Sequence, residues 1–416
     1  MEVFAAASHG VALMPARRFS VLFVLTPALH PNEGGVQMST CKLGRYFLHQ
    51  GHDVGVFSFA SEGHDQSQPM RLFHARHPGN AQERLNLSDL EVVLRDFQPD
   101  IVINQMPYEH QIGKLLKENK RYLLLGCLRN TLYSVKRNLE AFVTRTAPGP
   151  IKQLAGFKPV QQAFLWLHRA RHRADLRKIL DIYDHFVMFA PANLEELRYF
   201  VPEFCEEKIR LVPNSIPVVA TTVPPKEKRL LWLGRVAHQQ KRAELILPIW
   251  ERVRQSLPDW SLDVVGSGPL LETLQAEAVR KRLSHVQFYG RQVPDPYYRR
   301  ATIFFMTSAF EGFPNTLVEA QSYGTIPVVF DSYPMAKWIV EDGVNGHLVR
   351  PFDIDAMAQQ IVDVAQHSER ERFAKSALES ARRFHIDQVG QIWQDLFEAE
   401  VAKHARQSKA GEAMAG

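Results

Sequence analysis

The sequence predicts an α/β protein of two doubly wound domains, each with a parallel sheet between layers of helices. Short apolar runs alternate with longer segments of helical period along most of the chain. The runs are apolar on both faces, which is typical of parallel strands buried under helices. A proline-rich stretch, 213–225, divides them into two series and indicates a linker. We therefore expect a ligand cleft where the carboxyl ends of the two sets of strands face each other.

The strands are expected at the apolar runs, taken in chain order. The run 20–25 follows Arg17 and Arg18 but lacks a small-residue cleavage site, so we interpret it as a strand rather than a signal peptide. The expected strands of the first domain are 20–25, 53–59, 100–104, 122–125, 185–190 and 208–212, and those of the second are 229–233, 261–265, 285–289, 302–307 and 326–330.

Composition excludes several classes of protein. Hydrophobic residues make up 45% and charged residues 23% of the 416 residues, which is typical of a globular and not of a disordered chain. No apolar run approaches the roughly 18 residues that a membrane-spanning helix needs. The three cysteines are too few for a disulfide framework and lack metal-ligand spacing. We therefore expect a protein of a reducing compartment, the cytoplasm.

Positive charge is concentrated in one segment. Residues 120–178 contain thirteen Lys and Arg against two acids, a net charge of +11, so the chain total of +5 leaves −6 for the rest. This asymmetry predicts a localised anionic partner. Nucleic acid is not the expected partner, because no series of base-stacking aromatic residues accompanies the basic ones.

Within that segment, residues 160–180 predict a basic amphipathic helix that carries Arg169, Arg173 and Arg177. One interpretation is a peripheral contact with an anionic membrane, because basic amphipathic helices bind such surfaces. The other is a solvated helix packed on the first sheet. Both interpretations stay open.

Several strand-to-helix turns carry glycine where the backbone must turn sharply or approach a ligand. They are Gly34 with Gly35, Gly234 before Arg235, and the turn 266–268. Amide groups at a helix amino terminus favour phosphate, so each turn is a candidate anion site. The pattern Gly-x-Gly-x-x-Gly is absent from all three, which argues against nicotinamide binding.

The most informative stretch begins with Glu311 and reads Glu-Gly-Phe-Pro-Asn-Thr-Leu-Val-Glu-Ala. Its two carboxylates, Glu311 and Glu319, flank a turn, and a helix is expected at 315–323. First-turn amides have no partner within a helix and suit a phosphate group. The amides expected to be unpaired are those of Asn315, Thr316 and Leu317.

The spacing Glu, seven residues, Glu resembles the signature of the family-4 glycosyltransferases of the GT-B fold. The resemblance covers most of 229–352, with its motifs in order and at the expected spacing. The motifs are Leu-Gly-Arg at 233–235 with Lys241, Val-Gly-Ser-Gly-Pro at 265–269, Val-Gln-Phe-Tyr-Gly at 286–290 and Gly-Val-Asn-Gly-His-Leu-Val at 343–349.

This resemblance implies two Rossmann-like domains that face each other across a cleft. The first, 17–213, would bind the acceptor, and the second, 229–385, would bind a sugar nucleotide. The linker would span 214–228. A final helix at 386–405 would cross back to the first domain.

The resemblance also implies roles for single residues. Arg235 and Lys241 would stabilise the diphosphate leaving group without a metal, so no cofactor is expected. Glu311 would lie beside the donor sugar, and Glu319 would accept hydrogen bonds from the ribose hydroxyls. The other donor residues would be Gly34 and Gly35, which close over the diphosphate, Gly234 in the turn that carries Arg235, and Gln292 and Val293, which hold the base.

Many relatives carry a His after a central strand of the first domain, near the sugar and the acceptor. By this resemblance Arg129 stands at that position. An arginine cannot act as a base, but it could bind an acceptor phosphate or the donor. The alternative is a surface arginine at the start of a helix.

No metal site is assigned. Asp353 and Asp355 spell Asp-x-Asp, but they follow Pro351 and open an expected helix, so capping is the better interpretation. The pairs His74 with His77 and His168 with His172 lack a third ligand.

The prediction is a retaining hexosyltransferase that acts in capsule or lipopolysaccharide synthesis at the cytoplasmic face of the inner membrane. Its donor would be a nucleoside-diphosphate sugar, with UDP expected as the nucleotide, and its acceptor a glycan or a lipid-linked glycan. Two alternatives stay open. One is another GT-B enzyme, such as a sugar-nucleotide epimerase, and the other is a catalytically silent sugar-nucleotide-binding partner.

Overall fold

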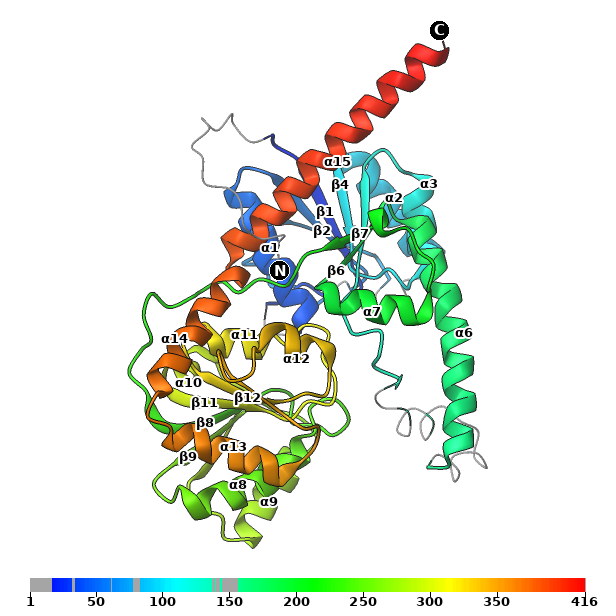
Figure 1. Cartoon of the computed structure of the whole chain (residues 1–416). Helices are drawn as coiled ribbons and strands as arrows, with labels where there is room; N and C mark the ends of the chain where they lie inside the picture. The colour runs from blue at the N-terminus through cyan, green and yellow to red at the C-terminus, as the bar shows by residue number, and fades with distance from the viewer. Residues whose placement is uncertain are drawn as a thin grey trace.

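The computed structural model describes residues 17–31, 34–60, 62–77, 83–136, 139, 143 and 156–415, with side chains described to residue 403. They form two Rossmann-like domains, each built on a parallel sheet (Figure 1). The first sheet has the order β3-β2-β1-β4-β5-β6-β7. Its strands are β1 (Ser20–Leu25), β2 (Asp53–Ser58), β3 (Arg71–His74), β4 (Ile101–Asn104), β5 (Leu123–Cys127), β6 (His185–Met188) and β7 (Ile209–Leu211).

Helices cover both faces of the first sheet, because every central strand is apolar on both sides. One face packs against α1 (Gly35–His49) and α15 (Ile386–Ala415). The other face packs against α2 (Arg84–Phe97), α3 (His110–Glu118), α6 (Lys158–Ile182) and α7 (Pro191–Phe200).

The second sheet has the order β10-β9-β8-β11-β12-β13. Its strands are β8 (Glu227–Leu233), β9 (Ser261–Val265), β10 (Val286–Gly290), β11 (Ala301–Met306), β12 (Ile326–Phe330) and β13 (His347–Val349). One face packs against α8 (Ile246–Ser256), α9 (Leu271–Arg280), α13 (Ile354–Gln366) and part of α14 (Arg370–Ala381). The other face packs against α10 (Asp295–Arg300), α11 (Asn315–Gln321) and α12 (Pro334–Ile339). The described part of the chain also contains the short 3₁₀ helices η2 (Glu206–Lys208), η3 (Ala243–Leu245) and η4 (Arg382–Phe384).

The predicted fold class is confirmed, and each predicted strand overlaps an observed one. The sequence did not predict β3 and β13, which lie at sheet edges. Both are short, and their residues are mostly half-buried or exposed, so they lack the continuous apolar run of a central strand. The final helix begins at Ile386 as predicted but continues to Ala415, ten residues beyond the predicted end at 405.

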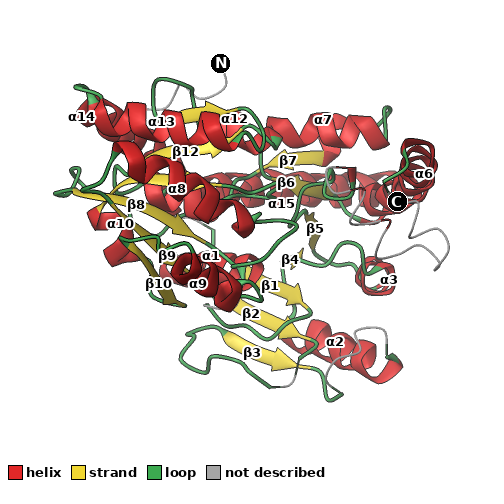
Figure 2. Ribbon diagram, turned by 90° about the horizontal axis from the view of Figure 1, so that it is seen from below, coloured by secondary structure: helices red, strands yellow, loops and turns green. Residues whose placement is uncertain are grey.

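The chain passes between the domains twice, and the two passages lie side by side. The amide of Ile216, in the segment between β7 and β8, donates to the carbonyl of Phe384 at 2.8 Å, and the amide of Ile386 donates to the carbonyl of Ile216 at 2.9 Å. Next to them, Phe189 of the first domain packs against Phe313 of the second, with ring centroids 5.7 Å apart. In the same interface, α7 lies against α12 (Figure 2).

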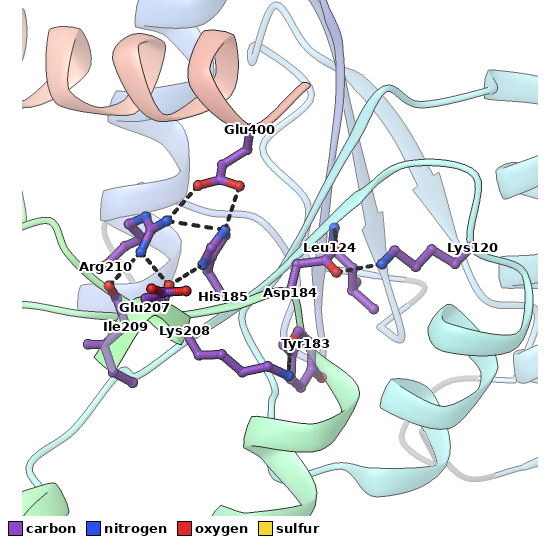
Figure 3. A network of polar contacts seen from close by, with 10 residues as sticks. All are labelled: Lys120, Leu124, Tyr183, Asp184, His185, Glu207, Lys208, Ile209, Arg210 and Glu400. Carbon is purple, nitrogen blue, oxygen red and sulfur yellow. Dashed lines mark hydrogen bonds and ion pairs between the residues drawn. The ribbon is translucent and has the colours of Figure 1, made fainter. Parts of the chain in front are cut away.

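A buried polar network fixes α15 on the first domain (Figure 3). The carboxylate of Glu400 lies 2.5 Å from Nη2 of Arg210 and 3.0 Å from Nε2 of His185. Nδ1 of His185 lies 3.1 Å from the carbonyl of Glu207. The helix that leaves the second domain is thereby held beside the first residue of β6 and the middle of β7.

No helix in the described part of the chain carries a stretch apolar enough to cross a bilayer, although α6 and α15 have the length for it.

Candidate active site

Glu311 and Lys241 form a buried ion pair in the second domain. Glu311 lies in the turn between β11 and α11 and is 5% exposed. Its Oε1 accepts from Nζ of Lys241 at 2.6 Å, and its Oε2 accepts from Nε2 of Gln240 at 3.1 Å. The structure thus brings together two residues that are 70 positions apart and that the sequence assigned to one site.

Hydrogen bonds to the backbone hold the loop that carries Lys241. The carbonyl of Gln240 accepts from the amide of Ala309 at 2.7 Å, and that of Lys241 accepts from Oγ1 of Thr307 at 2.7 Å. Thr307 also accepts from Nε1 of the buried Trp232 at 3.0 Å. These bonds fix the end of β11 relative to the loop after β8, so the ion pair is preorganised.

The glycine turn after β8 packs closely against this loop. A Cβ atom at Gly234 would lie 3.4 Å from Cε of Lys241. Gly266 has a φ of +137°, and a Cβ there would lie 1.8 Å from the carbonyl oxygen of Gly234, so only glycine fits. Arg235 is exposed in the same turn. Its guanidinium is therefore accessible to a ligand at the carboxyl ends of the strands.

The start of α11 corrects one prediction. The amide of Asn315 donates to the carbonyl of Phe313 at 2.9 Å, and the amide of Leu317 donates to that of Pro314 at 3.0 Å. The first turn is tight, so these two amides are used within it and are not unpaired as expected. Among the described residues, no partner is present for the amide of Thr316 or for its buried Oγ1 atom. Within the described part of the chain, Thr316 thus has an unpaired amide and an unpaired hydroxyl at this helix start.

The first domain meets α11 through the start of α1. A Cβ atom at Gly35 would lie 3.5 Å from Nδ2 of Asn315, and Gly34 precedes it as the cap residue of α1. Oδ1 of Asn315 accepts from Nδ2 of Asn214 at 3.3 Å. The predicted glycine loop and the predicted phosphate-binding helix therefore lie in contact, although residues 32 and 33 of the loop fall outside the described part of the chain.

Glu319 already has two partners, and the sequence predicted neither. Its Oε1 lies 3.4 Å from Nζ of Lys42 on α1, which makes an ion pair between the domains. Its Oε2 accepts from the hydroxyl of Tyr298 at 3.1 Å. Burial, and then the carboxylate of Glu319, raise the pKa of Tyr298 well above its usual value, so the hydroxyl stays protonated and donates. No spacing pattern links these residues, because Lys42 and Glu319 are 277 positions apart.

Gln292 and Val293 follow β10, the edge strand of the second sheet. Nε2 of Gln292 donates to the carbonyl of Tyr289 at 3.1 Å, and Val293 is 72% exposed. Neither takes part in the contacts around Glu311 and Glu319. Their role toward a base stays a prediction.

A pocket of about 280 Å³ opens in the first domain beside the Glu311 turn. Arg129 lines it, and its Nε donates to Oε1 of Gln105. The pocket adjoins the second domain, because a Cβ atom at Gly312 would lie 2.8 Å from Cα of Asn130. The pocket walls come from the ends of β4 and β5 and from α6, and include Met106, Tyr108, Leu128, Leu132, His168 and His172.

Two of the three arginines predicted to face a partner are used inside the first domain. Nε of Arg169 donates to the carbonyl of Tyr199 at 3.0 Å, and Nε of Arg173 donates to that of Phe200 at 2.7 Å. These carbonyls belong to the last two residues of α7, and cations stabilise a helix at its carboxyl end. Both arginines thus have a structural role, and Arg177 is the one of the three that is exposed.

Capping by Asp353 is confirmed, because its Oδ1 accepts from the amide of Ala356 at 3.0 Å at the start of α13. Among the residues whose side chains are described, no group of three His, Cys, Asp or Glu is placed to hold a metal ion.

Two family models match the two domains of the chain. The family model described as "Glycosyltransferase Family 4" matches residues 33–219, and that described as "Glycosyl transferases group 1" matches residues 227–367. The lipopolysaccharide 1,6-galactosyltransferase of Salmonella typhimurium is 31% identical over 160 residues, which cover 36% of this chain and 44% of the relative. The matched segment is therefore less than half of that relative's length.

Two solved structures show the same fold over nearly the whole chain. One is the apo form of the lipopolysaccharide outer core galactosyltransferase WaaB, with a TM-score of 0.66, 18% identity and coverage of 92% of this chain and 99% of that one. The other is the pneumococcal O-GlcNAc transferase GtfA in complex with UDP and GlcNAc, with a TM-score of 0.67, 13% identity and coverage of 93% and 100%. Both domains match glycosyltransferase family models and the architecture is shared, so the chain belongs to the family-4 glycosyltransferases of the GT-B fold.

Proposed function

We propose that the protein is a retaining glycosyltransferase that moves a hexose from a UDP-sugar to a hydroxyl group of a glycan or lipid-linked acceptor in cell-surface polysaccharide synthesis. One observation carries this proposal. Glu311, which pairs with Lys241, lies in the turn whose Gly312 touches the pocket loop of the first domain at Asn130. The relative that acts on lipopolysaccharide and the neighbour solved with UDP support the choice of reaction and nucleotide.

Lys241 and Arg235 would stabilise the diphosphate as it leaves. An ammonium group carries three donors, so Lys241 can keep its bond to Glu311 and still donate to a phosphate oxygen. Arg235 is exposed in the adjacent turn and adds a planar guanidinium, which suits phosphate. In this scheme the two cations supply the charge stabilisation that a metal supplies elsewhere.

Thr316 would bind the diphosphate at the start of α11, with its amide and its unpartnered hydroxyl. Glu319 would accept the ribose hydroxyls in exchange for Lys42, whose contact at 3.4 Å is long for a charged hydrogen bond. Lys42 would then be free to move toward the diphosphate side of the cleft.

Both oxygens of Glu311 accept hydrogen bonds, which favours a role in holding the donor sugar over a role as nucleophile. The leaving phosphate would then accept the proton of the acceptor hydroxyl on the same face of the sugar. A reaction on one face retains the anomeric configuration.

The same proposal includes a peripheral contact with an anionic membrane through α6. Phe157, Trp166 and Leu167 are 58%, 69% and 56% exposed near the start of this helix. Arg171 and Arg177 are exposed farther along it. Exposed aromatic and apolar side chains beside arginines suit the headgroup region of an anionic leaflet.

The test begins with thermal unfolding of the purified chain in the presence of UDP-, GDP- and ADP-sugars. We expect stabilisation by one UDP-sugar, because a ligand that binds the folded state raises the melting temperature. Mass spectrometry of products formed with a membrane extract then identifies the reaction. A glycan lengthened by one hexose supports the proposal, whereas a sugar nucleotide returned as its epimer, or no stabilisation by any sugar nucleotide, contradicts it.

A further inference from the structure

We propose that the pocket between β4, β5 and α6 binds an anionic group of the acceptor, a carboxylate or a phosphate, and that the guanidinium of Arg129 recognises it. That the ligand is an acceptor rests on the proposed function. That the pocket binds an anion rests on the contacts of Arg129.

The pocket has the right position for an acceptor. It lies at the carboxyl ends of β4 and β5, where Gln105 and Leu128 begin the loops that line it. The loop with Asn130 touches Gly312, the neighbour of Glu311. A sugar held in this pocket would have its hydroxyl groups next to the site proposed for the donor sugar.

Arg129 is held in place from one side. Its Nε donates to Gln105, and Nε2 of Gln105 donates in turn to Oγ1 of Thr40 on α1 at 3.3 Å. Its Nη2 atom is buried and has no hydrogen-bond partner among the described residues. A buried cationic nitrogen without a partner is costly, which is the arrangement expected of a group whose partner is a ligand.

Two titratable side chains near Arg129 are uncharged at neutral pH. The nearby thiol of Cys127 stays neutral, because burial raises its pKa. Burial also lowers the pKa of His172 to about 4, so this residue, which lines the pocket, is uncharged at neutral pH.

These features define the chemical class of the ligand. A guanidinium presents a planar set of N–H donors that matches the oxygens of a carboxylate or a phosphate. The rings of Tyr108 and His172 stack at 5.5 Å, and those of His172 and His168 at 5.2 Å, so one wall is a column of aromatic rings. A rigid wall beside one cation suits a charged sugar better than a neutral one.

Isothermal titration calorimetry on the full chain tests the inference with galacturonate, glucose 6-phosphate, inorganic phosphate, and the neutral sugars galactose and glucose. We expect at least one charged sugar to bind tenfold or more tightly than its neutral counterpart. A preference for galacturonate identifies a carboxylate ligand, and one for glucose 6-phosphate a sugar phosphate. Binding of inorganic phosphate alone, or no preference for charge, overturns the proposal.

Arg129→Met should lose that preference, and Arg129→Lys should keep only part of it. Arg95→Gln, which removes a 72% exposed arginine on α2 of the same domain, is the matched control and should bind like the wild type. Titration of wild type and Arg129→Met with UDP distinguishes failure of this proposal from failure of the proposed function. Loss of UDP binding in Arg129→Met, with binding of charged sugars retained, would place Arg129 in the donor site and overturn the acceptor role.

Thermal unfolding without ligand gives a second readout. If Arg129 binds a ligand rather than stabilising the fold, Arg129→Met should unfold at the same temperature as the wild type or a higher one, because a buried cationic nitrogen without a hydrogen-bond partner among the described residues has been removed. A marked loss of stability would show that Arg129 is structural.

Discussion

At the scale of single residues, the proposed chemistry involves a carboxylate that the fold has buried. Glu311 is 5% exposed and would be costly to hold as an anion without Lys241 and Gln240. The same lysine is proposed to stabilise the leaving group. A substitution of Lys241 alone should therefore lower both stability and activity. A double substitution of Lys241 and Glu311 should restore stability but not activity.

Replacing Lys241 with Met should destabilise the folded chain by about 3–5 kcal/mol, the usual effect of breaking a buried pair on one side. It should also lower kcat/KM by roughly 10- to 100-fold, through loss of a charge-assisted bond. The double variant Lys241→Met with Glu311→Gln should recover much of the stability and none of the activity. Urea unfolding and a donor hydrolysis assay measure the two effects.

Lys337→Met is the control, because Lys337 is 66% exposed and pairs with Asp331 at 2.9 Å elsewhere in the same domain. It should change stability by less than about 1 kcal/mol. Turnover of Lys241→Met at the wild-type level would contradict the assignment of this residue to the site.

Thr316→Val tests whether the hydroxyl of Thr316 binds a ligand. Oγ1 is buried without a partner, so the nearly isosteric valine should leave stability unchanged or raise it. Affinity for UDP should fall roughly tenfold, the effect of losing about 1.4 kcal/mol. Calorimetric titration with UDP measures this, and Thr302→Val, which removes a hydroxyl that bonds the carbonyl of Glu227, is the control. Equal UDP affinity in wild type and Thr316→Val would exclude a direct contact.

The sequence could place Glu311 and Lys241 in one site, because both stand in ordered motifs of one domain, and the structure brings them into contact. Their roles in the reaction stay predictions. It could not predict Lys42 and Tyr298 as the partners of Glu319. Their contacts depend on how α1 of the first domain and α10 of the second pack against α11. It also could not show that a tight first turn uses the amides of Asn315 and Leu317 and leaves that of Thr316.

At the scale of elements, α6 combines two kinds of arginine. Arg169 and Arg173 bind the carbonyls that end α7, whereas Arg177 is exposed. The sequence predicted the helix and its charge correctly. Which arginines face outward is set by the rotation of the helix on the sheet, and that rotation is fixed by the buried Leu176 and Ile179.

The exposed side chains at the start of α6 make the membrane proposal testable. The double variant Trp166→Ser with Leu167→Ser should bind vesicles of anionic lipid several-fold more weakly, because burial of each large apolar side chain in the interface contributes about 1.5–3 kcal/mol at most. Co-sedimentation with anionic and with neutral vesicles measures this. Val279→Ser, at a 79% exposed position on α9, is the matched control. Equal recovery of the wild type with both kinds of vesicle would defeat the electrostatic part of the proposal.

At the scale of the whole molecule, the two domains are joined by few but specific contacts. The two passages of the chain pair through Ile216, and Lys42 meets Glu319 across the cleft. The sequence predicted two Rossmann-like domains, since strand and helix patterns are local, whereas the returning helix was implied by the family resemblance. It could not predict how the domains lie relative to each other, because contacts such as Phe189 with Phe313 join residues that have no common pattern.

The anchor of α15 provides a prediction for the molecule as a whole. Burial alone would raise the pKa of Glu400, but hydrogen bonds from His185 and Arg210 outweigh it and leave the pKa below its usual value. A carboxylate with a lowered folded-state pKa stabilises the fold above its unfolded-state pKa, near 4.5. That stabilisation is lost as the pH falls through the folded-state value.

Glu400→Gln should therefore weaken the attachment of α15 by about 2 kcal/mol at pH 7, the size of a charge-assisted hydrogen bond. Hydrogen exchange of peptides from α15, corrected for the intrinsic rate at each pH, should show about 30-fold less protection than in the wild type at pH 7. The difference should shrink as the pH falls below 4.5, because the wild-type carboxyl then becomes protonated. Glu379→Gln, which removes a 74% exposed partner of Arg382, should leave α15 unchanged at every pH. A gap between Glu400→Gln and wild type that does not vary with pH would mean that the charge of Glu400 does not hold the helix in place.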